Sequence, residues 1–73
     1  MTADERALLE LLAAVDDGAT DALLIASGFA LDMMAGLVRR GFVTAHPERT
    51  LAAGKPVERL QIADAGRRAL AER

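Results

Sequence analysis

The chain has 73 residues, of which 52% are hydrophobic, but 16 of these are alanine, so large apolar side chains are few. It has no cysteine and one histidine, which excludes disulfide bonds and a structural zinc site, because zinc needs about four ligands drawn mostly from cysteine and histidine. We therefore expect one small domain, residues 1–73, stabilised by helix packing or by association with a partner.

No membrane-spanning or secretory segment is expected. The longest stretch without a charged residue, 22–31, is far shorter than the roughly 20 apolar residues that span a bilayer. No basic segment followed by an apolar core opens the chain, as it would in a signal peptide. These features predict a cytoplasmic protein.

The formal net charge of −2 conceals an uneven distribution. Residues 1–38 carry seven acids against one base, whereas residues 39–73 carry eight bases against four acids. The second half could therefore present a basic surface to an anionic partner. Ordinary solubility residues near helix ends and on a hairpin explain the same charges nearly as well.

A first helix is predicted from the capping box formed by Thr2 and Glu5 to about Val15. Its large apolar residues cover a wide arc, which indicates burial against more than one neighbour. These residues are Leu8, Leu9, Leu11, Leu12 and Val15. Leu9 and Leu11 mark the two edges of the arc, so one of them should be uncovered in the monomer.

Two short helices follow. Residues 16–18, Asp-Asp-Gly, end the first helix, and Thr20 is predicted to cap a second helix that stops near Gly28. A third helix is predicted over residues 31–40 and closes at Gly41. Two helices joined by a tight glycine turn form a helix-turn-helix.

The period of the apolar pattern then changes from about 3.6 to 2 residues. Residues 42–44 favour a strand and residues 57–62 alternate, which predicts a β-hairpin with its turn at 53–56 and a bend or bulge at Pro47. A last helix is predicted over 63–73. The fold class is α+β and mainly α, with a core made of Leu8, Leu12, Val15, Leu24, Met34 and Leu37 and closed by Leu60 and Ile62 of the hairpin.

Two stretches of the chain resemble MarR-type and PadR-type bacterial regulators. Residues 37–43, LVRRGFV, are similar to the join between recognition helix and wing in those families, and residues 60–70, LQIADAGRRAL, are similar to the join between the last wing strand and the next helix. The resemblance implies a winged helix-turn-helix domain, with a three-helix core, a β-hairpin wing and a C-terminal helix. Ala63 departs from the pattern, since those families have a capping Thr or Ser there.

The resemblance implies DNA binding. In such regulators the third helix reads bases in the major groove, but here it offers few base-reading side chains, and Asp32 reads as an ordinary acid near a helix start. Affinity is instead expected from phosphate contacts by Arg39, Arg40, Arg49, Lys55 and Arg59. The favoured prediction is a small, transcription-regulator-like homodimer that binds double-stranded DNA.

The alternative is a winged-helix protein–protein interaction module that binds no DNA. Glycine inside a helix costs roughly 1 kcal/mol relative to alanine, so Gly36 suggests close approach of a partner helix or of a DNA backbone, although drift explains it about as well. The residues expected at an interface are Leu9, Leu11, Leu31 and Gly36.

Enzyme activity is not expected. His46 lies beside Pro47 and has no nearby serine, cysteine or carboxylate pair with which to complete a nucleophilic site. The sequence predicts no metal and no other cofactor.

Overall fold

The computed structural model describes the backbone of residues 1–52 and 55–72 and the side chains of residues 1–48 and 57–72. Within these residues the chain is α+β, with four helices and a three-stranded antiparallel sheet. The elements in chain order are α1 (Ala3–Ala13), β1 (Ala19–Thr20), α2 (Asp21–Ala26), α3 (Leu31–Arg39), β2 (Val43–Ala52), β3 (Lys55–Ile62) and α4 (Asp64–Ala71). None of the described helices is both long enough and apolar enough to cross a membrane.

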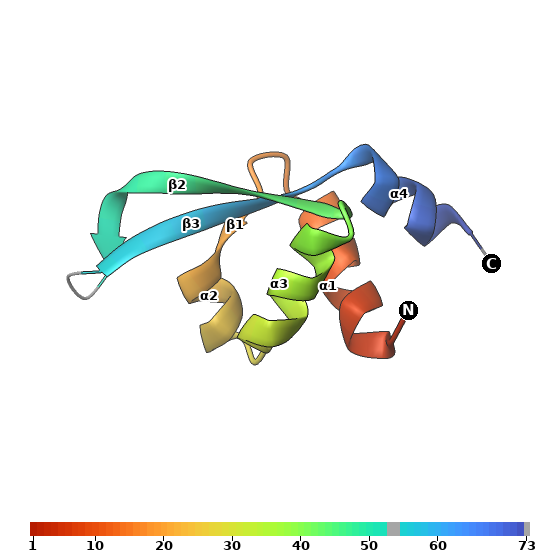
Figure 1. Cartoon of the computed structure of the whole chain (residues 1–73), viewed down its shortest axis with the longest axis horizontal. Coiled ribbons are helices and arrows are strands. Elements are labelled where there is room, and N and C mark those ends of the chain that lie inside the picture. Colours follow the sequence, from red (N-terminus) through yellow and green to blue (C-terminus); the bar gives the residue numbers. More distant parts are fainter. Residues whose placement is uncertain (53–54, 73) are drawn as a thin grey trace.

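The helices gather at one end of the hairpin. Figure 1 shows α1, α2 and α3 beneath the β2–β3 hairpin, and α4 beyond the end where the hairpin joins the helices. The other end of the hairpin projects past the helices, so the molecule measures 41 Å along its longest axis against 21 and 20 Å across.

The predicted helix starts are confirmed by their hydrogen bonds. In α1, the Thr2 amide donates to Glu5 Oε1 at 2.8 Å and the Glu5 amide donates to Thr2 Oγ1 at 3.1 Å. In α2, the Leu23 amide donates to Thr20 Oγ1 at 3.2 Å. Helix α4 begins after Ala63, which supplies no side-chain cap.

The predicted hairpin is also present. Val43 pairs with Ile62, Ala45 pairs with Leu60, and the register shifts between Pro47 and Leu51, which confirms the irregularity predicted at the proline. Of the predicted turn at 53–56, residues 53–54 lie outside the described part of the chain.

The strand β1 is absent from the sequence prediction, because two residues are too short to show a period. It pairs with β3, so the strand order is β1-β3-β2, with Ala19 opposite Leu60 and Thr20 opposite Arg59. Gly18 makes this pairing possible. Its φ is +73°, and a β-carbon there would lie 2.0 Å from the Leu60 carbonyl oxygen.

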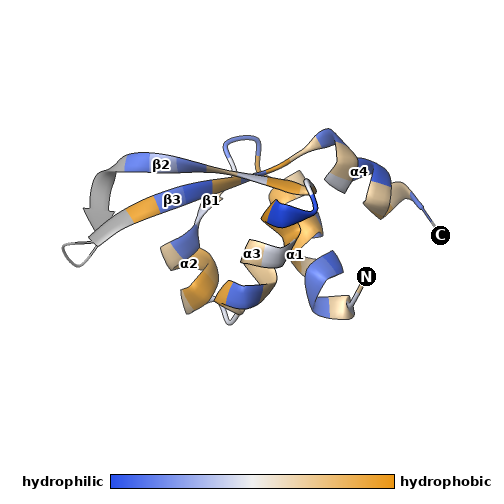
Figure 2. Cartoon of the chain, in the orientation of Figure 1, coloured by the Kyte–Doolittle hydropathy of each residue, from blue (hydrophilic) through white to orange (hydrophobic). Residues whose placement is uncertain are grey.

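The core lies where the helices meet the sheet. Figure 2 shows apolar residues along α1, α2 and α3 and at the end of the hairpin that covers them. The buried cluster consists of Leu8, Leu9, Leu12, Ala19, Leu24, Met34, Leu37, Val43 and Leu60, and Ile62 is among the half-buried residues that pack against it. The prediction for Val15 is wrong: α1 ends at Ala13, and Val15 is 38% exposed in the turn that follows.

Helix α4 is attached through Gly66, the glycine of the LQIADAGRRAL stretch. A β-carbon at Gly66 would lie 2.3 Å from the Phe42 carbonyl oxygen. The same oxygen accepts a hydrogen bond from the Ala63 amide at 3.0 Å. Glycine therefore lets α4 lie directly against the link between α3 and β2.

Candidate interaction site on the third helix

Helix α3 has a buried side and an exposed side. Met34 and Leu37 are buried in the core. The exposed and half-buried residues on its other side form what we call the α3 face: Leu31, Asp32, Ala35, Gly36, Val38 and Arg39. At about 100° per residue, Leu31, Ala35 and Val38 lie along one edge of this face, and Asp32, Gly36 and Arg39 lie along the other.

A groove runs beside the α3 face, between α3 and the β2–β3 sheet, with a volume of about 340 Å³. Its apolar lining consists of Leu31, Met34, Ala35, Val38, Ala45 and Leu60. Ala35 on α3 and Ala45 on β2 are small, and small side chains on both walls leave the space that larger ones would fill. Leu31 is 60% exposed and Val38 is 37% exposed, so both remain accessible to a partner.

Among the described residues, three charged ones also line the groove: Asp21, Glu58 and Arg39. Asp21 Oδ1 accepts hydrogen bonds from the Ala22 amide at 2.7 Å and from the Glu58 amide at 3.2 Å. This carboxylate therefore accepts one amide from the first turn of α2 and one from β3, and so links α2 to β3. The groove consequently carries two acids from α2 and β3 and one base from α3.

Arg59, expected to contact phosphate, is engaged within the chain. Its Nε donates to Glu48 Oε1 in an ion pair, and its Nη1 donates to the Asp17 carbonyl oxygen at 3.2 Å. Arg59 on β3 pairs with His46 on β2, so Glu48, two residues after His46, is the diagonal neighbour of Arg59. A phosphate at Arg59 would have to displace Glu48.

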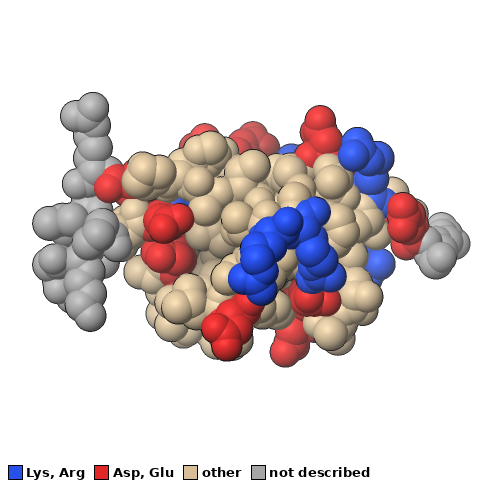
Figure 3. Space-filling model, viewed as in Figure 1, with Lys and Arg blue, Asp and Glu red and all other residues tan. Residues whose placement is uncertain are grey.

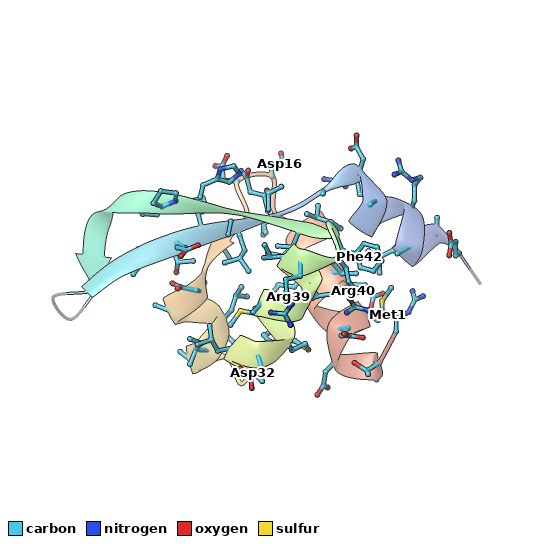
Figure 4. All side chains as sticks on the ribbon, viewed as in Figure 1. Met1, Asp16, Asp32, Arg39, Arg40 and Phe42 are labelled. Carbon is cyan, nitrogen blue, oxygen red and sulfur yellow. The ribbon has the colours of Figure 1, made fainter. Side chains whose placement is uncertain are left out.

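Arg40 is engaged in a similar way. Its Nη2 donates to Glu5 Oε2 in an ion pair, and its guanidinium lies 5.3 Å from the centroid of the Phe42 ring. Figure 4 shows Arg40 beside Phe42 at the carboxyl end of α3. The side chain joins the end of α3 to the start of α1, while 45% of it remains exposed.

Glu5 makes this junction sensitive to pH. The hydrogen bond from the Thr2 amide is the largest contribution that lowers the pKa of the Glu5 carboxyl below its ordinary value of 4.5, and contacts with Arg40 lower this pKa further. Because the pKa is lower in the folded state, the stabilisation is complete above the unfolded-state pKa and is lost as pH falls through the folded-state pKa.

We therefore expect Glu5→Gln to lower the thermal midpoint of unfolding at neutral pH. The difference from wild type should disappear in acid, once the Glu5 carboxyl is protonated in the folded state. Thermal unfolding followed by circular dichroism across an acid pH series measures this. Glu10→Gln, at an exposed position of the same helix, is the control and should change the midpoint little at any pH. A Glu5→Gln deficit that persists unchanged in acid would contradict the electrostatic cause.

The remaining basic candidates lie in different places. Arg39 is exposed on the α3 face, next to Arg40 in the chain. Figure 3 shows a group of basic side chains over α3. Acidic side chains lie around this group, and most of the remaining visible surface is uncharged. The side chains of Arg49 and Lys55 lie outside the described residues. The structure thus brings Arg39 and Arg40 together at the end of α3, while Arg59 binds the loop between α1 and β1.

Of the four residues expected at an interface, one is buried in the core and three lie at the surface. Leu9 is completely buried in the core, so it is corrected from an interface residue to a core residue, and Leu11 is 40% exposed. Leu31 and Gly36 both lie on the α3 face. Sequence reasoning missed Ala45, since nothing in the sequence places it opposite α3.

Comparison of the chain with models of protein families, with curated proteins and with solved structures finds no match. Among the described residues, no three histidine, aspartate or glutamate side chains are grouped so that they could hold a metal ion. The α3 face and the groove beside it are therefore the features of the molecule that indicate a function.

Proposed function

We propose that this chain is a winged-helix protein-interaction module whose α3 face and adjoining groove receive an apolar helical segment of a partner chain. The observation that carries the proposal is the apolar groove of about 340 Å³ beside two exposed aliphatic residues, Leu31 and Val38. Exposed apolar surface next to a groove is typical of sites that bind a protein partner. The order of three helices, hairpin and final helix supports the winged-helix assignment.

The shape of the groove favours an amphipathic helix as its ligand. Such a helix presents apolar side chains at positions i, i+3 and i+4, and these can contact the apolar lining of the groove. Leu31 and Val38 lie seven residues apart, about two helical turns, so a partner of two or three turns would cover both. Burying them gains about 25 cal/mol for each Å² of apolar surface removed from water.

DNA binding is the second candidate, and the adjacent basic residues Arg39 and Arg40 favour it. Three acids oppose it: Asp32 on the α3 face and Asp21 and Glu58 at the groove. Carboxylates at these positions would repel the phosphates that supply most non-specific affinity. DNA binding that occurs in spite of them would be steeply dependent on salt and weakly selective for sequence.

The experiment is a selection of helical peptides from a random library, followed by fluorescence anisotropy titrations of the selected peptides at a protein concentration in the low micromolar range. We expect Leu31→Asp to weaken their binding at least tenfold, because it places a charge in the apolar contact. Leu23→Asp is the matched control, since Leu23 is 58% exposed on α2 and does not line the groove. It should leave the affinity within about twofold.

A parallel titration with random duplex DNA at low salt separates the two candidates. The docking proposal predicts no binding of the duplex and no competition with the peptides. Duplex binding with a salt dependence that decreases by about one unit in Arg39→Ala would establish the DNA candidate instead. Peptides whose affinity is equally reduced by Leu23→Asp would contradict docking at the groove.

A further inference from the structure

The charges of the α3 face are arranged for a partner related by a two-fold axis. Asp32 lies in the first turn of α3 and Arg39 in the last turn, seven residues apart, which places them on the same edge of the face. Figure 4 shows Asp32 near the start of the helix and the Arg39 side chain lying back alongside it. A second copy of α3 laid antiparallel would set each Asp32 beside the Arg39 of the other copy, so one symmetric contact would make the same ion pair twice.

The apolar edge of the α3 face also matches a second copy of itself in the antiparallel arrangement. In an antiparallel arrangement, Leu31 of one copy lies beside Val38 of the other, again twice. Both side chains are exposed in the single chain. The two edges therefore match in one and the same orientation, with apolar residues against apolar residues and acid against base.

Small residues lie at the middle of the helix, where the two copies would cross. A β-carbon at Gly36 would meet only Arg39 Nη2, at 3.8 Å, so packing within the single chain does not require glycine there. This differs from Gly18 and Gly66, where a β-carbon would collide with backbone. Gly36 lowers the stability of α3, and packing within the single chain does not require it. We therefore assign its role to contact with a second helix, because Ala35 and Gly36 allow another helix backbone to come close to α3.

From these three observations we propose that the partner docked on the α3 face is a second copy of this chain, bound through antiparallel α3 helices that cross at Ala35 and Gly36. The inference rests on the proposed docking function and identifies the occupant. Two of the other exposed apolar side chains, Leu11 and Val15, fit less well because they lie beside acids, so docking them next to Asp21 and Glu58 would bring like charges together. Because the contact is centred on one helix, the dimer is weak and forms at high protein concentration.

Sedimentation equilibrium from about 10 µM to about 1 mM tests the proposal, since this range brackets weak dimers. The wild-type chain should shift from its monomer mass of 7.7 kDa toward twice that mass. Asp32→Arg and Arg39→Asp should each remain monomeric, because each variant puts like charges at both ends of the contact. An equimolar mixture of the two variants should recover the dimer, because each copy then meets the opposite charge at both ends.

The mixture also controls for folding and for net charge. Asp32→Arg brings the formal charge of the chain to neutral and Arg39→Asp makes it more acidic, so the variants have no opposite net charges to draw them together. Dimer recovery on mixing requires that both variants be folded. Wild type that remains a monomer up to about 1 mM, or a mixture that does not dimerise, would overturn the inference.

Gly36→Ala provides an independent readout. Alanine favours the helix and has room within the single chain, so the thermal midpoint measured at low concentration should rise. The two added β-carbons would meet at the crossing point, so the dimer dissociation constant should rise at least tenfold. An unchanged dissociation constant would contradict the crossing at Gly36. A monomeric wild type that still binds selected peptides through Leu31 would overturn self-docking alone and leave the proposed function intact.

Discussion

Replacing Gly18 with alanine is expected to lower the free energy of unfolding by about 3 kcal/mol, which combines the cost of a left-handed backbone with that of a steric collision. The alanine β-carbon would lie 2.0 Å from the Leu60 carbonyl oxygen and 2.8 Å from Gln61 Cγ. Strand β3 is held by β1 on one side and β2 on the other, so it cannot move away without loss of pairing. For 73 residues a total stability of about 4 to 11 kcal/mol is usual, so the loss is a large fraction of it.

Gly41→Ala is the matched control for this change. Gly41 has a φ of +78°, close to the +73° of Gly18, but a β-carbon there would meet nothing within 4 Å. Gly41→Ala should therefore lower the free energy of unfolding only by the cost of a left-handed backbone at a non-glycine residue, about 1 kcal/mol. Urea unfolding followed by far-UV circular dichroism measures both variants. Equal losses would show that close packing of Gly18 against Leu60 contributes nothing to stability.

Leu24→Ala is expected to lower the free energy of unfolding by about 3 kcal/mol, within the range found when buried leucines are truncated. Leu24 is completely buried, and it is the buried residue of the six-residue helix α2. A helix this short has little stability of its own, so its position depends on the packing of this side chain. Alanine keeps the helical propensity, so the loss reports the packing alone.

Leu23→Ala is the matched control, because it makes the same substitution one residue away at an exposed position. Leu23 is 58% exposed, so its truncation should change stability by no more than about 0.5 kcal/mol. The same urea titration compares the two variants. Similar decreases in the free energy of unfolding for Leu24→Ala and Leu23→Ala would contradict the packing of α2 against the core through Leu24.

Docking on the α3 face and readout of DNA by α3 exclude each other. Both would use Leu31, Asp32 and Arg39, because these side chains point away from the core. A chain whose α3 faces are paired in a dimer cannot insert the same helix into a major groove. One end of the hairpin projects past the helices (Figure 1), while Ala45, Glu58 and Leu60 of the same hairpin line the groove.

The four helices and the hairpin of this protein follow from its sequence alone, because their signals lie within a few residues of one another. Thr2 and Glu5 cap α1 across three residues, Thr20 caps α2, and the change of period marks the hairpin. The helical period placed Leu8, Leu12 and Leu37 correctly in the core, but it put Leu9 at the edge of the apolar arc. It also put Val15 in the core, since the period cannot show that α1 has already ended at Ala13.

Tertiary structure decided which of these residues are available to a partner. Arg40 meets Glu5 across 35 residues of sequence and Arg59 meets the Asp17 carbonyl across 42, and no local pattern encodes such distant pairs. The groove likewise exists because Ala35 and Ala45 come to lie on facing walls, and β1 exists because Gly18 can approach Leu60. Caps and periods act through the neighbouring backbone, whereas ion pairs, grooves and close backbone contacts depend on how whole elements pack, which a single sequence leaves open.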